Sequence, residues 1–336
     1  MLVAVLGVVG YSAFRLMGEW PSTSRQVEPG LPVHVMIEQG STTAAIAGQL
    51  AELGVIDSAF MFRLKVRDTG AGERLKAGEY DLATGMAYED VIARLTAGTT
   101  VEYVDVTIPE GFTAEQVAAR MAAQAGVPAD EMLRLCTTGA DEFVADHPYL
   151  EGAHNGSLEG FLYPATYSIE PGTQPREIVE MMLGKFDREV AVVDLSYAET
   201  RGLDLVDVVV IASILEREAR LEDEFPLVSS VIYNRLARPM KLQLCATVMY
   251  TMPDGTTALT TKDLEQETPY NTYLHDGLPA GPISNPGMRA LQAAARPAET
   301  DYLYYVLTGA DGSQTFTATY DEFLEAKRRG QAALGN

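Results

Sequence analysis

The segment from Leu205 to Arg220, LVDVVVIASILEREAR, places the tightest constraint on how this chain can fold. Its apolar residues fall on every side of a helix and not on one stripe, so a helix here has to be buried on all sides. The segment nevertheless carries a carboxylate, Glu216, before it ends. We therefore expect a helix over about Leu205 to Ala219 inside a domain, with a carboxyl group at its end.

Glu216 is a candidate general acid. A carboxyl at the end of a buried helix loses hydration when it ionises, which raises its pKa and suits it to transfer a proton near neutral pH. The alternative is an ordinary ion pair, since Arg220 stands four residues further along the same helix face. Glu218 lies on the opposite face, so the two glutamates cannot form a carboxylate dyad. The simplest interpretation of Glu218 is a solvated charge near Arg217 and Glu222.

Length and charge limit the classes of function. The chain has 336 residues, 47% of them hydrophobic, enough for a substantial core and about two domains. Its formal net charge of -22 would repel a nucleic-acid backbone or an anionic lipid surface, so we expect no nucleic-acid partner. Cys136 and Cys245 show no CxxC spacing, and the histidines show no metal-ligand spacing. We therefore expect neither a metal site nor a disulfide framework.

The amino terminus, MLVAVLGVVGYSAFRLMGEW, carries the one membrane signal in the sequence. Its uncharged run from Met1 to Phe14 is shorter than the ~20 residues that cross a bilayer, although Arg15 could snorkel and extend the run. A cleaved leader would have a basic region before the run and a small-residue cleavage site after it, and the sequence has neither. We expect residues 1–17 to be a membrane anchor truncated at its start, and residues 18–30 to be a linker.

Residues 31–100 predict a small first domain. The stretch VHVMI alternates like a strand, two segments with helical spacing follow, and AGEYDL can supply a return strand. The order strand, helix, helix, strand resembles a LysM-like module, which is a glycan-binding fold. A further strand, within TVEYVDVTIPEG, then leads into a larger domain over residues 101–336. The predicted fold class is therefore α+β, with the domain boundary near residue 100.

The second domain alternates helices with loops that are rich in glycine and proline. Thr113 and Gln116 have the spacing of a capping box, so we expect a helix to begin there. The stretch DHPYLEGAHNGSLEGFLYPATYSI, residues 146–169, predicts a loop too long for a plain connection, and we interpret it as a candidate binding segment. Near the carboxyl end, YLYYVL and SQTFTAT flank a turn and predict a hairpin before a charged final helix.

Two segments that follow the predicted helix over Leu205 to Ala219 are rich in amides and tyrosines: SSVIYNRLARPMKLQLCATVMY and TPYNTYLHDGLPAGPISNPGMRALQAAARP. In carbohydrate clefts, aromatic faces stack on sugar rings and amides bond to hydroxyl groups. Loops made rigid by glycine and proline would explain the glycines, but not the accumulated amides and tyrosines. These segments therefore favour a glycan-binding cleft.

Several stretches of the sequence, taken in order, resemble a known family. The ordered set ASILERE, YNRL, KLQ…ATVMY, PYNTY…GLPAGPISNPG and YLYYV…G…TF resembles the endolytic murein transglycosylases of the MltG/YceG-like family. The upstream stretches IPEGFTAEQVA and LEGFLYPATY are similar to that family as well, so the resemblance covers most of the chain from near residue 30. Each piece alone is weak, whereas the ordered set is highly specific.

The resemblance implies a single-pass membrane enzyme that faces the cell wall, with a LysM-like subdomain and a catalytic domain that cuts glycan strands internally. The catalytic glutamate of the family's ASI.E.E motif is assigned to the first one, Glu216. By this resemblance Glu216 protonates the glycosidic oxygen between N-acetylmuramic acid and N-acetylglucosamine. It then takes the proton from the muramyl C6 hydroxyl, whose attack closes a 1,6-anhydro ring without water. One carboxyl can act as acid and later as base, which matches the absence of an evident second carboxylate.

Resemblance and chemistry together imply a set of substrate-binding residues. They are Ser213, Asn234, Gln243, Tyr270, Asn271 and Tyr273, with Glu159 and Tyr163 added from the long loop. One departure matters: where the family often shows Gln-Thr-Asp-Pro-Thr, this chain has Gln-Leu-Cys-Ala-Thr, with Cys245 in the aspartate position. A role of that aspartate therefore does not carry over. The resemblance implies no cofactor and no metal.

Two other classes of function remain open at this point. A non-catalytic peptidoglycan-binding scaffold of the wall-synthesis machinery would use the same cleft without cutting, and a lysozyme-like hydrolase would leave reducing ends. The chain has no GxGxxG or Walker sequence, and Ser157 lacks the glycine two positions before it that a nucleophile elbow requires. The expected partners are peptidoglycan glycan strands, cell-wall synthases and elongation or division proteins, with the membrane reached through the anchor.

Overall fold

The computed structural model describes residues 28–38, 40–98, 103–253, 256 and 258–334. The chain divides into two compact units, one that ends at Val101 and one that begins at Glu102. Each unit has a hydrophobic core of its own. The predicted α+β class is confirmed, because the described part of the chain contains both helices and small antiparallel sheets.

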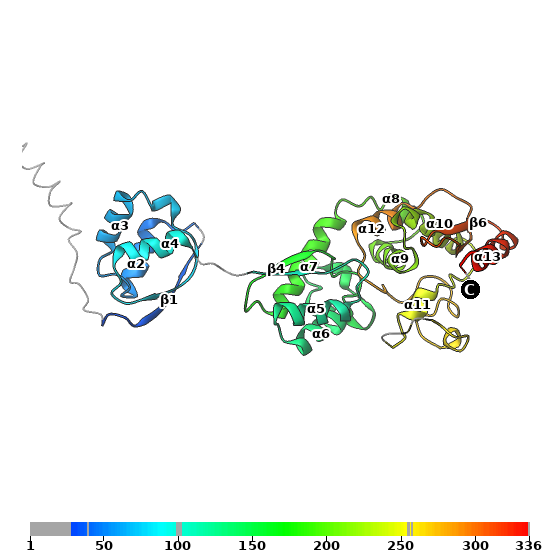
Figure 1. Ribbon diagram of the computed structural model, residues 1–336, viewed down its shortest axis with the longest axis horizontal. Helices are drawn as coiled ribbons and strands as arrows, with labels where there is room; N and C mark the ends of the chain where they lie inside the picture. Colours follow the sequence, from blue (N-terminus) through cyan, green and yellow to red (C-terminus); the bar gives the residue numbers. More distant parts are fainter. Residues whose placement is uncertain (1–27, 39, 99–102, 254–255, 257, 335–336) are drawn as a thin grey trace, which may run out of the picture. The chain divides into compact units, whose positions relative to one another are not determined.

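The first unit is built on a two-stranded antiparallel sheet. Its elements in chain order are β1 (Pro32–Ile37), α2 (Thr43–Glu52), α3 (Ala59–Asp68), β2 (Gly78–Ala83) and α4 (Tyr88–Ala97) (Figure 1). Val35 pairs with Tyr80 across the sheet, and both side chains are buried. The hydroxyls of Thr42 and Ser58 accept backbone N–H groups and so cap α2 and α3. The predicted order of strand, helix, helix, strand is present.

The second unit holds the candidate site. Its elements in chain order are β3 (Val104–Thr107), α5 (Ala114–Ala125), α6 (Ala129–Thr138), β4 (Thr166–Ile169), α7 (Pro175–Val190), α8 (Ser196–Thr200), α9 (Leu205–Glu218), α10 (Phe225–Leu236), α11 (Cys245–Met249), α12 (Met288–Ala295), β5 (Tyr304–Leu307), β6 (Gln314–Thr317) and α13 (Tyr320–Leu334) (Figure 1). Helices α10, α11 and α12 all pack against α9. The site is therefore organised around α9.

Helix α9 is buried on all sides, as its sequence predicts. Asp204 and Asp207 begin the helix with a reciprocal capping box. Every residue from Val208 to Leu215 is buried. Burial becomes partial at Glu216, so the helix leaves the core where its carboxyl groups begin.

Two local predictions are confirmed and one is partly wrong. The capping box of Thr113 and Gln116 begins α5, and β5 and β6 form the predicted hairpin. The predicted long loop ends too late, because residues 166–169 form β4, which pairs antiparallel with β3. In β4 the side chains of Tyr167 and Ile169 are buried while their neighbours are exposed, the alternation of a half-buried strand.

The predicted anchor, residues 1–17, lies outside the described residues, as does most of the predicted linker over residues 18–30. The last linker residue, Gly30, is described and has a φ of +91°. Throughout the described ranges, no helix is long and apolar enough to cross a membrane.

Candidate active site

Glu216 lies on the last turn of α9 and is partly buried. Its Oε1 accepts a hydrogen bond from the backbone N–H of Gly287 at 2.8 Å. Burial is the main reason that the pKa of Glu216 is raised to about 7. The Gly287 N–H opposes this effect, whereas the carboxylates of Glu110 and Glu222 add to it. A group with this pKa exchanges its proton near neutral pH, which is the property predicted for Glu216.

The alternative ion pair between Glu216 and Arg220 is not formed. The Arg220 side chain lies against Gly312, where an added Cβ atom would meet the arginine Cδ at 2.8 Å. A neighbouring ion pair joins Arg289 to Glu222. Among the residues that the structure describes, Glu216 therefore keeps a carboxyl without a cationic partner.

Glu110 is a second carboxyl near Glu216 that the sequence does not indicate. Its side chain covers Gly287 so closely that a Cβ atom at that position would overlap the Glu110 carboxyl. Burial raises the pKa of Glu110, with the Glu222 charge adding to the rise and Arg289 opposing it. Glu110 stands in the loop before α5, and only the fold brings it to Gly287.

Glu218 faces a different part of the unit. Its Oε1 accepts the backbone N–H of Ala246 at 3.0 Å, and its Oε2 accepts the hydroxyl of Tyr305 at 3.0 Å. The interpretation of Glu218 as a solvated charge is therefore wrong, because α11 and β5 cover its carboxyl group. Burial raises the pKa of Glu218, and Arg235 is among the groups that oppose the rise.

Two of the segments predicted to line a glycan cleft meet at Glu218. The backbone N–H of Gln243 donates to the Thr272 carbonyl at 3.0 Å, and the next N–H donates to the Thr272 hydroxyl at 2.9 Å. Cys245 Sγ lies 3.1 Å from the hydroxyl of Tyr273. Cys245 immediately precedes the residue that bonds to Glu218. The predicted residues Gln243 and Tyr273 therefore belong to the wall that covers Glu218.

Glu159, a predicted substrate-binding residue of the long loop, is only 2% exposed, and its carboxyl group lies at the first residue of α5. Both of its carboxylate oxygens accept the Ala114 N–H at 3.0 Å, and the Tyr250 hydroxyl and the Asn285 amide each donate at 3.1 Å. Burial raises the pKa of Glu159 to about 8, although these hydrogen bonds favour its ionised form. The ring of Tyr250 also packs on the predicted Tyr270, with centroids 4.9 Å apart.

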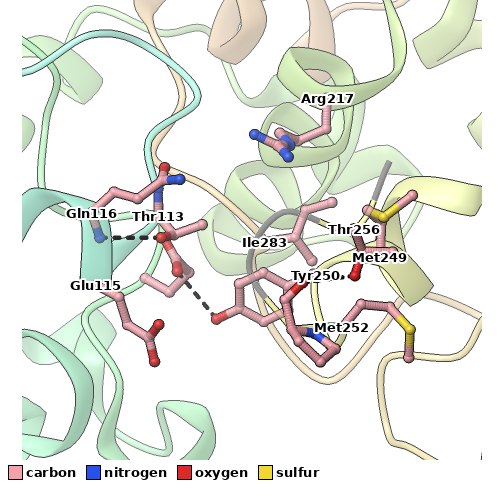
Figure 2. A pocket seen from close by; sticks show the side chains of 11 residues that line it. Thr113, Glu115, Gln116, Arg217, Met249, Tyr250, Met252, Thr256 and Ile283 are labelled. Atoms are coloured by element: carbon pink, nitrogen blue, oxygen red, sulfur yellow. Dashed lines mark hydrogen bonds between the residues drawn. The ribbon is translucent and has the colours of Figure 1, made fainter. Parts of the chain in front are cut away.

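A cavity of about 350 Å³ lies between the start of α5 and α11. Figure 2 shows Thr113, Glu115 and Gln116 on one side of it, and Met249, Tyr250 and Met252 on the other. Glu159 contributes to the lining as well. Arg217 reaches the cavity from α9, and its guanidinium donates to the Gly111 carbonyl at 3.4 Å. The cavity is therefore next to the last turn of α9, with polar groups and an aromatic ring in its wall.

Two predicted residues hold the framework together in the buried interior. Ser213 is fully buried, and its hydroxyl accepts the backbone N–H of Ile283 at 3.0 Å, which fastens α9 to the loop before α12. Asn271 is also fully buried. Its Oδ1 accepts the Tyr273 N–H at 3.0 Å, and its amide donates to two carbonyls of the preceding loop. Both side chains stabilise the walls of the site and are enclosed by protein.

Asn234 and Tyr163 form hydrogen bonds to segments other than the last turn of α9. The Asn234 amide donates to the carbonyls of Thr300 and Tyr302, at 2.9 and 3.0 Å, and lines a separate cavity of about 480 Å³. Tyr163 is buried, and its carbonyl accepts the Tyr167 hydroxyl at 2.6 Å. Tyr250, Asn285 and Glu110 were not predicted as site residues. Each lies in a stretch that resembles the family, but no local pattern distinguishes it from its neighbours.

Comparisons with known proteins agree on one family. The model of the YceG-like family matches residues 35–329. An endolytic murein transglycosylase of Bacillus subtilis is 33% identical over 306 residues, which are 88% of this chain and 84% of that protein. An endolytic murein transglycosylase of Streptococcus pneumoniae strain R6 is 29% identical over 304 residues, and the match spans 55% of that longer protein.

A solved structure agrees with the sequence comparisons. The crystal structure of a yceG-like protein from Listeria monocytogenes superposes with a TM-score of 0.57 at 32% sequence identity. The superposition covers 88% of this chain and 99% of that protein. The family match spans both units and includes the last turn of α9, the long loop and the cavity wall. The chain belongs to the YceG-like family.

Proposed function

We propose that this protein is a lytic transglycosylase that cuts peptidoglycan glycan strands internally. Two observations support the proposal. The Bacillus subtilis relative, which matches over most of its length, is named an endolytic murein transglycosylase. The last turn of α9 also carries two carboxyls, Glu216 and Glu218, that have raised pKa values and no ion-pair partner among the described residues. These two carboxyls are the observation that carries the proton-transfer chemistry of the proposal.

In the proposed reaction a protonated carboxyl first donates its proton to the oxygen that links N-acetylmuramic acid to N-acetylglucosamine. The glycosidic bond breaks, and the bonding electrons leave with that oxygen. The resulting carboxylate then takes the proton of the muramyl C6 hydroxyl, whose oxygen attacks the anomeric carbon. The products are a 1,6-anhydro end and a new hydroxyl end, and no water is consumed.

We assign the proton transfer to Glu218, with Glu216 as the second candidate. The wall formed by the segments of Gln243 and Tyr273 closes over Glu218, and amides and tyrosines are the side chains that bind sugars. Glu216 contacts the loop that contains Gly287. The pKa of Glu216, about 7, supports it as an acid at neutral pH, so both residues enter the test.

The predicted substrate-binding residues divide into two groups under this proposal. The first group is assigned to glycan binding: Gln243 and Tyr273 belong to the wall over Glu218, Glu159 lines the cavity next to α9, and Tyr270 packs on Tyr250 of that cavity. The second group, Ser213, Asn234, Asn271 and Tyr163, forms hydrogen bonds within the protein and is not assigned to glycan binding.

We further propose that the first unit is a LysM-like glycan-binding module and that residues 1–17 anchor the protein in the cell membrane. The catalytic unit then lies on the outer side of the membrane, where the glycan strands are. Cell-wall synthases and elongation or division proteins are the proposed partners. The order of elements in the first unit supports the module assignment, and the apolar run at the amino terminus supports the anchor.

Digestion of purified, uncrosslinked glycan strands tests the proposed activity. Mass analysis of the ends separates three outcomes: 1,6-anhydro ends for a lytic transglycosylase, reducing muramyl ends for a hydrolase, and unchanged strands for a binding scaffold. The length distribution separates internal from terminal cleavage, since internal cuts shorten the mean length before monomeric units accumulate. We expect anhydro ends at internal positions.

A further inference from the structure

Arg235, at the end of α10, is an arginine in the interior of the second unit. The residue is 8% exposed, and it forms no ion pair within 4 Å among the described residues. Its Nε donates to the Leu303 carbonyl at 2.7 Å, and its Nη1 donates to the Leu242 carbonyl at 2.5 Å. The guanidinium carbon lies 5.3 Å from the centre of the Tyr304 ring. A buried guanidinium that bonds only to carbonyls is costly, so its position calls for an explanation.

The two carbonyls belong to the two segments that donate hydrogen bonds to Glu218. Leu242 lies four residues before Ala246, whose N–H bonds to Glu218 at 3.0 Å. Leu303 lies two residues before Tyr305, whose hydroxyl bonds to Glu218 at 3.0 Å. The planar guanidinium presents its donors in a fixed fork, which can hold both segments at one spacing.

We propose that Arg235 is a positioning residue, which holds with one guanidinium both segments that donate hydrogen bonds to the Glu218 carboxylate. The role of Glu218 in proton transfer rests on the proposed function, whereas the clamp itself rests only on the contacts above. Without Arg235 the Ala246 N–H and the Tyr305 hydroxyl lose their fixed distance to Glu218, and the carboxyl loses its orientation toward the substrate.

The positive charge of Arg235 has a second effect on the same carboxyl. A cation nearby favours the ionised form of Glu218 and opposes the rise in pKa that burial causes. The other groups near this carboxyl are the Ala246 N–H and Tyr305, with Tyr273 and Cys245 beside them. None of these groups carries a positive charge, so Arg235 supplies the positive charge that acts on this carboxyl. The clamp and the charge can be separated, because lysine keeps the charge but has no fork.

The test uses the full chain with Arg235→Gln, Arg235→Lys and the control Arg238→Gln. Arg238 is an exposed arginine just beyond the end of the same helix. The readouts are the pKa of Glu218 from carboxyl carbon chemical shifts, and kcat and KM on purified glycan strands. We expect Arg235→Gln to raise the pKa of Glu218 by about 1 to 3 and to lower kcat by about 10- to 100-fold, with KM nearly unchanged. Arg235→Lys should lower kcat with a smaller change in that pKa, and Arg238→Gln should change neither.

An Arg235→Gln protein that keeps the Glu218 pKa and the kcat of the control overturns the proposal. If Arg235→Gln does not fold, Arg235→Lys carries the test, and an unchanged kcat in that variant overturns it. The assignment of Glu218 as the acid can fail separately. In that case Arg235→Gln still moves the pKa of Glu218, while Glu218→Gln leaves the production of anhydro ends intact.

Discussion

The hydroxyl of Tyr305 donates a hydrogen bond to Oε2 of Glu218 at 3.0 Å, although the two residues are 87 positions apart in the chain. This bond ties strand β5 to the end of helix α9. Because it stabilises the ionised carboxylate, it also opposes the rise in the pKa of Glu218 that burial causes. The contact therefore helps to orient the carboxyl and, together with the Ala246 N–H, opposes the effect of burial on its pKa.

Tyr305→Phe removes this donor and keeps the ring. We expect the pKa of Glu218 to rise and the rate of strand cleavage to fall by about tenfold, because the Glu218 carboxylate loses one of its hydrogen-bond donors. The measurement is the rate of anhydro-end formation across pH 5 to 9. The control is Tyr320→Phe, because Tyr320 is 55% exposed on α13. Equal rates for both variants would show that the Tyr305 hydroxyl has no part in catalysis.

Gly160→Ala should destabilise the second unit. Gly160 has a φ of +90°, and an added Cβ atom would lie 2.6 Å from the Pro282 side chain and 2.7 Å from that of Val209. Overpacking of this kind costs about 1–3 kcal/mol of unfolding free energy, in addition to backbone strain. Gly172→Ala is the matched control, since Gly172 also has a φ of +90° but nothing within 4 Å.

Thermal unfolding of the two glycine variants measures the difference. The Gly160→Ala protein should melt several degrees below the Gly172→Ala protein, because strain at positive φ is common to both and the clash is not. Equal melting temperatures would mean that the contact of Gly160 with Pro282 relaxes at no cost.

The pH dependence of stability should report on Glu159. The pKa of Glu159 in the folded protein, about 8, lies above its ordinary value of 4.5, so the folded state holds a proton that the unfolded chain releases. The resulting contribution to the unfolding free energy is fully present below pH 4.5 and is lost as the pH rises to about 8. The wild type should therefore lose stability across this window.

Glu159→Gln removes this titration, so its stability should fall less between pH 4.5 and 8 than that of the wild type. Denaturant unfolding at several pH values measures the two slopes. Glu151→Gln, at an exposed glutamate of the same loop, should keep the wild-type slope. A Glu159→Gln protein with the wild-type slope would mean that Glu159 stays ionised in the folded state.

Structural features that depend on a pattern within one segment could be predicted from the sequence, and the burial of α9 is the clearest case. Apolar residues on every side of the helix predict full burial, and the residues from Val208 to Leu215 are indeed buried. The raised pKa of Glu216 follows from the same reasoning, because its cause is its place at the end of that helix. The capping box of Thr113 and Gln116 is likewise a local pattern.

The surroundings of Glu218 could not be predicted in this way. Periodicity places Glu218 on the face opposite Glu216 but does not reveal what covers that face. Its partners, Ala246 and Tyr305, come from segments whose contact with α9 is set by tertiary packing. The same reason explains why the sequence did not indicate that Glu110 lies against Gly287.

Cleavage of glycan strands by Glu218→Gln and Glu216→Gln, compared with the wild type, tests the central claim most directly. Mass analysis counts the 1,6-anhydro ends, and a binding measurement on the same strands verifies that each variant still holds its substrate. The account predicts that Glu218→Gln lowers the yield of anhydro ends by about 10²–10⁴-fold with binding retained, while Glu216→Gln keeps most of the activity. Loss of activity in Glu216→Gln alone would move the acid to that residue. Wild-type yields of anhydro ends from both variants would contradict the claim that the last turn of α9 supplies the catalytic proton.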